Sequence, residues 1–171
     1  IQKALVTGEV MKLCKSYRST CEITDFAQKI RTNTDLEPVA RHGEKPRVLQ
    51  YNNEKEELSS IKELIATYQA SAYKSLGIVC KTESQACEMA DKLQIPDIHF
   101  LSNQSSAFVQ GIVIISAHMA KGLEFDEVII PQVDDRNYHS EIDRSMLYVA
   151  VTRAMHRLTL TYSGTKHTPF I

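Results

Sequence analysis

The sequence contains no tryptophan and only four cysteines in 171 residues. The cysteines form two pairs, Cys14 with Cys21 and Cys80 with Cys87, and six residues separate the members of each pair. The ligands of a structural zinc site are usually only about two to four residues apart. The spacing therefore favours free thiols over zinc ligands, and we expect no metal on this chain and a location in the reducing cytoplasm.

Long apolar runs and a strong excess of one charge are absent too. No apolar stretch approaches the roughly 20 residues of a membrane helix, so we expect no membrane partner. The net charge is -1, so any contact with nucleic acid would depend on a local surface. The first residues, IQKALVTGEV, lack the basic start and apolar stretch of a secretion signal. A start at Ile1 rather than Met indicates a fragment of a longer protein.

The six glycines, at positions 8, 43, 77, 111, 122 and 164, do not form a P-loop. That loop has the pattern Gly-x-x-x-x-Gly-Lys-Ser/Thr and wraps the phosphates of a nucleotide. The acidic pair Asp126-Glu127 does not close a strand in the way that a magnesium-binding Walker pair would. The chain therefore lacks the phosphate-binding loop that a P-loop nucleotide hydrolase needs to act alone.

Apolar spacing predicts helices that alternate with short strands. A capping box between Ser19 and Glu22 indicates a first helix, and a second begins at Glu54. Further helices are expected around residues 86–93 and over 142–155. The runs RVLQY, LGIVC, DIHFL, IVIIS, EVIIP and RLTLTY read as strands. Continuous Val and Ile runs between helices favour a parallel sheet covered on both faces, and hence one α/β domain over residues 1–171.

Arg153 stands out in the stretch YVAVTRAMHRLTLTYSG. Ile142, Met146, Val149 and Arg153 follow one another at intervals of four, three and four, which places the arginine on the expected buried side of a helix. A guanidinium keeps its charge and must reach water, a carboxylate or a phosphate. The spacing alone leaves two interpretations open, a snorkelling arginine near a helix C-terminus and an anion ligand.

The stretch KSYRST places Tyr17 and Arg18 just ahead of the expected first helix. A helix N-terminus suits an anion, a tyrosine can stack on a base, and an arginine can bind a phosphate through two hydrogen bonds. An ordinary surface pair is the alternative.

The stretch SAHMAKGLEFDEVIIP carries a polar loop between two strands. Its candidate residues are Ser116, His118, Lys121, Gly122 and Glu124. In open α/β sheets, ligands bind at the carboxyl ends of strands, and we expect this loop to lie at such an end. A polar loop with a glycine turn is the alternative.

Together these stretches resemble motifs of the superfamily 1 helicases of the UvrD/Rep type. LCKSYRST is similar to motif IV, AHMAKGLEFDEVIIP to motif V, and DRSMLYVAVTRAMHRLTLTY to motif VI. The resemblance covers essentially the whole chain and implies the second RecA-like motor domain, a three-layer P-loop NTPase-type sandwich without its own P-loop. The short spacing from motif IV to motif V, and the stretch EPVARHGEKPRV, favour the HelD or helicase IV-like branch. The family often has two arginines where this chain has Arg144 and Ser145.

The resemblance implies roles for five residues around ATP. Tyr17 would stack on the adenine, and Arg18 would contact the terminal phosphates. Glu124, supported by the turn at Gly122, would bind the ribose. Arg153 would be the arginine finger that stabilises charge on the γ-phosphate.

The resemblance also implies partners. Ser116, His118 and Lys121 would face single-stranded DNA or relay its presence to the nucleotide. ATP with Mg²⁺ would bind in the cleft with a missing N-terminal RecA-like domain, so the isolated chain would be inactive. The implied function is that of an ATP-dependent DNA helicase or translocase. Two alternatives stay open: a HelD-like ATPase that remodels RNA polymerase, and an inactive nucleotide-binding scaffold.

Overall fold

The computed structural model describes residues 15–16, 19–31, 37–38, 41–101 and 111–171. Tyr17, Arg18 and Cys14 lie outside the described residues. Within the described chain, six parallel strands form one sheet in the order β3-β8-β7-β4-β6-β5. Their bounds are β3 Arg47–Tyr51, β4 Ser75–Cys80, β5 Ile98–Leu101, β6 Gly111–Ser116, β7 Phe125–Ile130 and β8 Ala154–Ser163. A separate parallel pair joins β1 (Lys15–Ser16) to β2 (Glu37–Pro38).

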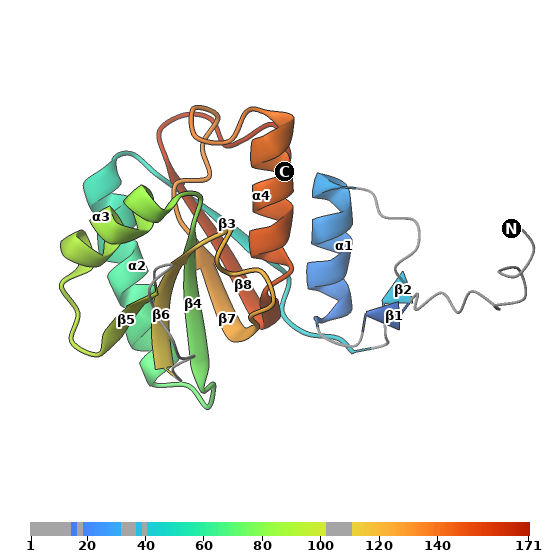
Figure 1. The fold of residues 1–171 in the computed structure, drawn as a ribbon, viewed down its shortest axis with the longest axis horizontal. Helices are drawn as coiled ribbons and strands as arrows, with labels where there is room; N and C mark the ends of the chain where they lie inside the picture. The colour runs from blue at the N-terminus through green and yellow to red at the C-terminus, as the bar shows by residue number, and fades with distance from the viewer. Residues whose placement is uncertain (1–14, 17–18, 32–36, 39–40, 102–110) are drawn as a thin grey trace, which may run out of the picture.

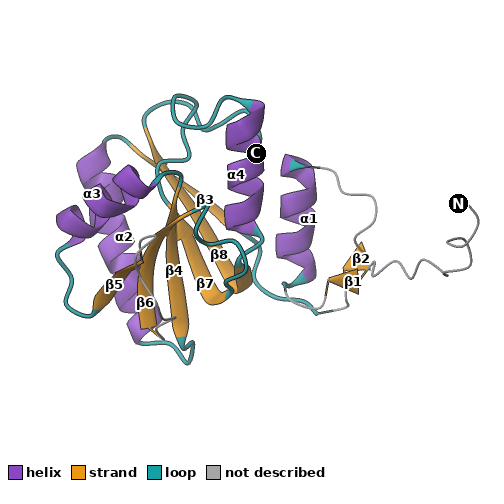
Figure 2. Ribbon diagram, viewed as in Figure 1, coloured by secondary structure: helices purple, strands orange, loops and turns teal. Residues whose placement is uncertain are grey.

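Helices cover both faces of the sheet (Figure 1), which Figure 2 shows as a layer of strands between helices. Helices α1 (Cys21–Ile30) and α4 (Glu141–Val151) cover one face, and α2 (Glu54–Gln69) and α3 (Glu83–Leu93) cover the other. Along β4, Ile78 packs with α2 and α3 and Val79 packs with α1 and α4, as the alternation of a strand requires. This confirms the predicted α/β fold of RecA-like type. No helix in the described part of the chain is both long and apolar enough to cross a membrane.

The start of α1 differs from the expected capping box. Thr20, not Ser19, is the N-cap, and its side chain accepts from the backbone N–H of Ile23. Glu22 instead accepts from the backbone N–H of Gly43 at 2.9 Å. The Ser19 hydroxyl donates to the carbonyl of Ala154 at 2.6 Å, so this serine joins the start of α1 to the start of β8.

Helix α4 is shorter than expected and buries a different face. It ends at Val151, and Met155 already belongs to β8. Ile142 is 70% exposed, whereas the buried residues of the helix are Asp143, Leu147, Ala150 and Val151. The prediction of a helix over 142–155 with Ile142 and Arg153 on its buried side is therefore wrong.

Residues 117–124 connect β6 to β7 across β4 without a helix. Ala117, Ala120 and Phe125 pack in the same core as α1 and α4, so the connection shares that face of the sheet. The Phe125 ring lies against Gly77 of β4, where an ideal Cβ would lie 2.5 Å from Phe125 Cδ2. Gly77 therefore makes room for the ring at the end of the connection.

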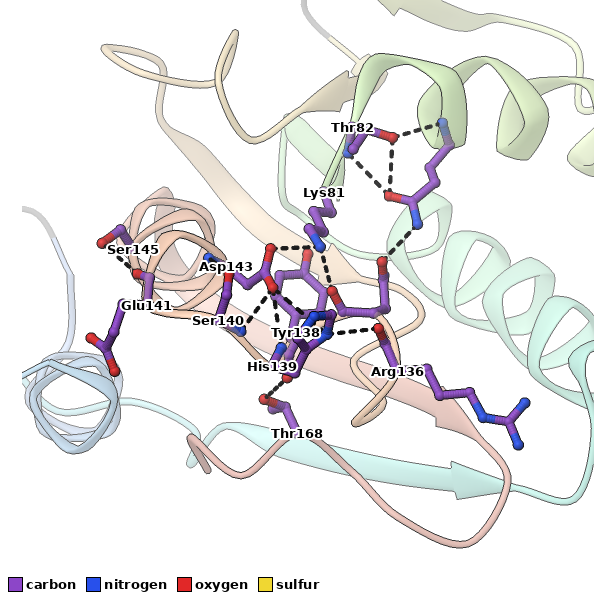
Figure 3. Close-up of polar contacts among 12 residues, drawn as sticks. Lys81, Thr82, Arg136, Tyr138, His139, Ser140, Glu141, Asp143, Ser145 and Thr168 are labelled. Carbon is purple, nitrogen blue, oxygen red and sulfur yellow. Dashed lines mark hydrogen bonds and ion pairs between the residues drawn. The ribbon is translucent and has the colours of Figure 1, made fainter.

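A buried ion pair holds the first turn of α4 (Figure 3). Lys81, which follows β4, places its Nζ 2.6 Å from Oδ1 of Asp143. The two side chains are 16% and 8% exposed. Burial opposes ionisation of Asp143, but hydrogen bonds from Lys81, Ser140 and His139 hold the pKa of its carboxyl well below the usual value.

We expect Gly77→Ala to destabilise the chain by about 1–3 kcal/mol, because the added methyl group overlaps the Phe125 ring. Urea unfolding of the purified chain would measure this loss. In a double variant with Phe125→Leu the smaller side chain should relieve the overlap, so that the two effects are coupled by more than about 0.5 kcal/mol. Strictly additive losses would contradict this account of Gly77.

The acid stability of the chain should depend on Asp143. Its pKa in the folded state lies below the unfolded value of about 3.9, so the carboxylate contributes stability above about pH 4 and loses it as the pH falls. We expect the difference in unfolding free energy between wild type and Asp143→Asn to be largest near neutrality and to shrink from about pH 4 to pH 2. Denaturant unfolding at a series of pH values would measure it, and parallel curves would argue against an ionised Asp143.

Candidate functional site

Arg153 lies in the turn between α4 and β8, not inside the helix. Its Nε donates to the carbonyl of Val149 at 3.0 Å, and its Nη1 donates to the carbonyl of Leu123 at 3.2 Å. Its Nη2 donates to Oγ1 of Thr152 at 3.1 Å. The half-buried guanidinium thus caps the last turn of α4, which its charge favours, and joins that turn to the end of the 117–124 connection.

The backbone strengthens the same junction. The N–H of Phe125 donates to the carbonyl of Arg153 at 3.0 Å, and the N–H of Leu123 donates to the carbonyl of Ala120 at 3.0 Å. Gly122 has a φ of +92°, which L side chains rarely adopt. The turn at Gly122 therefore brings the half-buried Glu124 into the segment that Arg153 holds.

The other candidate residues of the loop precede Gly122. Ser116 ends β6, and its side chain is buried, with its Oγ 3.4 Å from the backbone N of Met119, from which it accepts. His118 and Lys121 are exposed, and the N–H of Lys121 donates to the carbonyl of His118 at 3.4 Å. Ser116 thus supports the turn, whereas the side chains of His118 and Lys121 face solvent.

The site residues are divided between the two edges of the sheet. Ser116 lies at the carboxyl edge, at the end of β6. Glu124 precedes Phe125, which pairs with Ala154 at the amino edge. The expectation that the whole loop lies at the carboxyl ends of the strands is therefore wrong, because eight residues without a helix run from one edge back to the other.

Tyr17 and Arg18 lie outside the described residues, but their neighbour Ser19 is informative. Ser19 follows Arg18 in the chain and donates to Ala154, which follows Arg153. The ends of two sequence motifs, 135 positions apart, are thus in direct contact. Motifs IV, V and VI all reach the amino edge beside α1 and α4.

A polar cluster on the other side of the amino edge was not expected from the sequence. Arg157 contacts Glu44 at 2.9 Å and Glu127 at 3.1 Å, and its guanidinium lies 5.1 Å from the centre of the Tyr73 ring. Burial raises the pKa of the Glu127 carboxyl, although Arg157 opposes that shift. Arg157 is 17% exposed, which fits a role in holding β7, β8 and the Glu44 segment together. The sequence signal that could have indicated this cluster is the presence of Glu127 and Arg157 in two runs that were predicted to be strands.

The ion pair of Lys81 and Asp143 was also missed. The signal was a lysine directly after the apolar strand LGIVC and an aspartate three residues after Ser140. An acid at that position completes a helix cap, so its second role in an ion pair was not evident from sequence.

The described residues contain no group of three His, Cys, Asp or Glu side chains that could hold a metal ion. Among the described cysteines, Cys80 and Cys87 are free thiols. Burial raises the pKa of the Cys80 thiol to about 12, so this thiol stays protonated at neutral pH.

Comparisons with known proteins agree with these observations. The model of the UvrD-like helicase C-terminal domain matches residues 11–110 and 98–165. A crystal structure of the C-terminal domain of a possible DNA helicase from Lactobacillus plantarum WCFS1 matches with a TM-score of 0.76 and 29% identity over 91% of both chains.

Two curated proteins match part of the chain. DNA helicase II of Escherichia coli (strain K12) is 34% identical over an alignment of 73 residues, and the match covers 37% of this chain and 10% of that protein. The Gabija protein GajB of Bacillus cereus (strain VD045) is 41% identical over 58 residues, 34% of this chain and 12% of that protein. The matched part of the chain thus spans only about a tenth of the length of these relatives.

The comparisons do not distinguish the HelD-like branch, and they give no support to an RNA polymerase partner, so both stay predictions from the sequence. The family itself is clear. The family model covers most of the chain, and a solved C-terminal helicase domain has the same fold over nearly its whole length. The resemblance seen in the three motifs is confirmed, and the chain belongs to the UvrD-like helicase C-terminal domain family.

Proposed function

We propose that residues 1–171 form the C-terminal motor domain of a cytoplasmic ATP-dependent DNA helicase or translocase. The observation that carries the proposal is the meeting of three motifs at the amino edge of the sheet. Ser19 contacts Ala154 at 2.6 Å, and the Arg153 guanidinium contacts the Leu123 carbonyl at 3.2 Å. Such an edge can present several side chains at once to a nucleotide held by another domain.

Arg153 is the residue that we assign to the γ-phosphate. The carbonyls of Val149 and Leu123 orient the Arg153 guanidinium. A cation that is oriented in advance stabilises the charge that develops in phosphoryl transfer. Arg18, next to Ser19, would contact the terminal phosphates. Both arginines would approach ATP from across a cleft, so hydrolysis would require the cleft to close.

The base and sugar of ATP would be held by the same edge. Tyr17 would stack on the adenine, and Glu124, delivered by the turn at Gly122, would accept hydrogen bonds from the ribose hydroxyls. An N-terminal RecA-like domain of the same protein would supply the P-loop and the Mg²⁺ ligands, because this sequence has no P-loop. This chain would therefore be half of an active site.

The first part of the 117–124 connection, before Gly122, would meet single-stranded DNA. His118 and Lys121 are exposed there, and a lysine can pair with the phosphate backbone. Ser116 would act by supporting the turn that carries them. Cycles of cleft closure and opening would then move the motor along the strand.

The first test is Arg153→Ala in the full-length protein. We expect ATP binding to change little and turnover to fall about 10³-fold or more, because the variant loses an interaction made in the transition state. Arg153→Lys should recover little, since lysine keeps the charge but lacks the planar fork. Steady-state ATP hydrolysis and nucleotide titration would measure both quantities.

Arg136→Ala, which changes an exposed arginine in the loop after β7, is the matched control and should behave as wild type. Thermal unfolding of each variant would separate the helix-capping role of Arg153 from its role in turnover. Wild-type turnover by a folded Arg153→Ala variant would leave Arg153 as a structural cap alone.

The turn at Gly122 can be tested against a matched glycine. Gly122 and Gly164 have φ values of +92° and +99°, and an ideal Cβ on either would meet nothing within 4 Å. Alanine at either position should therefore cost about 1–2 kcal/mol of backbone strain. Only Gly122→Ala should slow ATP hydrolysis by the full-length protein, by about 10-fold to 100-fold, because it displaces Glu124. Equal effects of the two variants on hydrolysis would argue against a role for this turn in the site.

A further inference from the structure

The two ends of α4 lie at opposite edges of the sheet, and each end is held by a different charged side chain. At the amino edge, the helix ends beside Arg153. At the carboxyl edge, the first turn contains Asp143, which pairs with Lys81 (Figure 3). An 11-residue helix is a rigid rod of about 16 Å. A shift at one end therefore moves the other.

Lys81 binds the β7–α4 loop through several contacts at once. Its Nζ pairs with Asp143 and also donates to the carbonyl of Asn137. It lies 5.5 Å from the centre of the ring of the fully buried Tyr138. One side chain after β4 thus fixes the loop that leads into α4.

Asp143 uses its second oxygen to cap the helix. Its Oδ2 accepts from the backbone N–H of Ser140 at 2.9 Å and from that of His139 at 3.2 Å. The Ser140 hydroxyl in turn accepts from the backbone N–H of Asp143 at 3.2 Å. The carboxylate therefore joins Lys81 directly to the first turn of α4.

The same strand end is joined to the segment that we assign to DNA. Lys81 follows Cys80, whose carbonyl accepts from the backbone N–H of Ala117 at 2.7 Å. Ala117 follows Ser116, and His118 comes next. A displacement of the 116–118 segment by a bound strand would thus act directly on the backbone that carries Lys81.

Stability alone does not explain this pair. A buried ion pair loses hydration on both sides, and replacing such a pair with uncharged residues is often neutral or stabilising. What the pair provides is a fixed link between the end of β4 and the first turn of α4, because Lys81 also bonds the carbonyl of Asn137 and Asp143 also accepts from two backbone N–H groups. The contact is suited to transmit position.

We propose that Lys81 and Asp143 are positioning residues that couple the DNA-facing end of the 117–124 connection to Arg153 through α4. The proposal rests on the function proposed above. In that proposed function, neither Lys81 nor Asp143 touches ATP. The pair sets the placement of Arg153 according to whether DNA is bound.

The test is ATP hydrolysis by the full-length protein with and without a single-stranded oligonucleotide. Lys81→Met together with Asp143→Asn removes both charges and keeps an oxygen that can cap α4. We expect basal hydrolysis and the KM for ATP to stay near wild type, while stimulation by DNA falls by about tenfold. Lys81→Arg, which keeps the charge, should retain most of the stimulation.

Lys92→Met together with Glu88→Gln is the matched control, because it removes an exposed ion pair on α3. It should leave stimulation unchanged. Full stimulation in the Lys81 and Asp143 double variant would overturn the coupling, and an equal loss of basal and stimulated hydrolysis would show a merely structural role. A wild-type protein that DNA does not stimulate would instead overturn the proposed function, and the coupling with it.

Discussion

The hydrogen bond from the Arg153 guanidinium to the Leu123 carbonyl is the contact on which the candidate site depends. It joins the turn after α4 to the end of the connection between β6 and β7. The connection can reach that point only because it crosses β4 without a helix, and Gly77 leaves the space that the Phe125 ring needs there. Core packing therefore determines the position of a charged group at the edge.

Two segments run from the carboxyl edge of the sheet to its amino edge. One is the 117–124 connection, and the other is helix α4. Each has one end near His118 or Lys81 and the other near Arg153. In the function proposed above, a motor domain must relate the state of a nucleic acid to the state of a nucleotide, and these two routes would give it the physical means. A buried ion pair at the first turn of α4 and the half-buried Arg153 at its end hold the two ends of the helix.

The elements themselves were largely predictable from sequence. The run LGIVC is buried at every position in β4, and such runs between helices are typical of parallel sheets. The start of α1 was displaced by one residue, because the Ser19 hydroxyl bonds to Ala154 in a distant strand. The face of α4 was assigned wrongly because Asp143 is buried and Ile142 is exposed. Hydropathy cannot anticipate a buried carboxylate whose lysine partner lies 62 positions earlier in the chain.

By itself the sequence determined the succession of strands and helices along the chain, the three motifs and the absence of a P-loop. Apolar spacing and residue type express these features directly. Only the tertiary structure decided which residues share an edge. It separated Ser116 from Glu124, brought Ser19 to Ala154 and placed Arg153 on the Leu123 carbonyl. The reason is that a parallel sheet returns distant segments to a common edge, and the side chains that meet there depend on strand order rather than on distance along the chain.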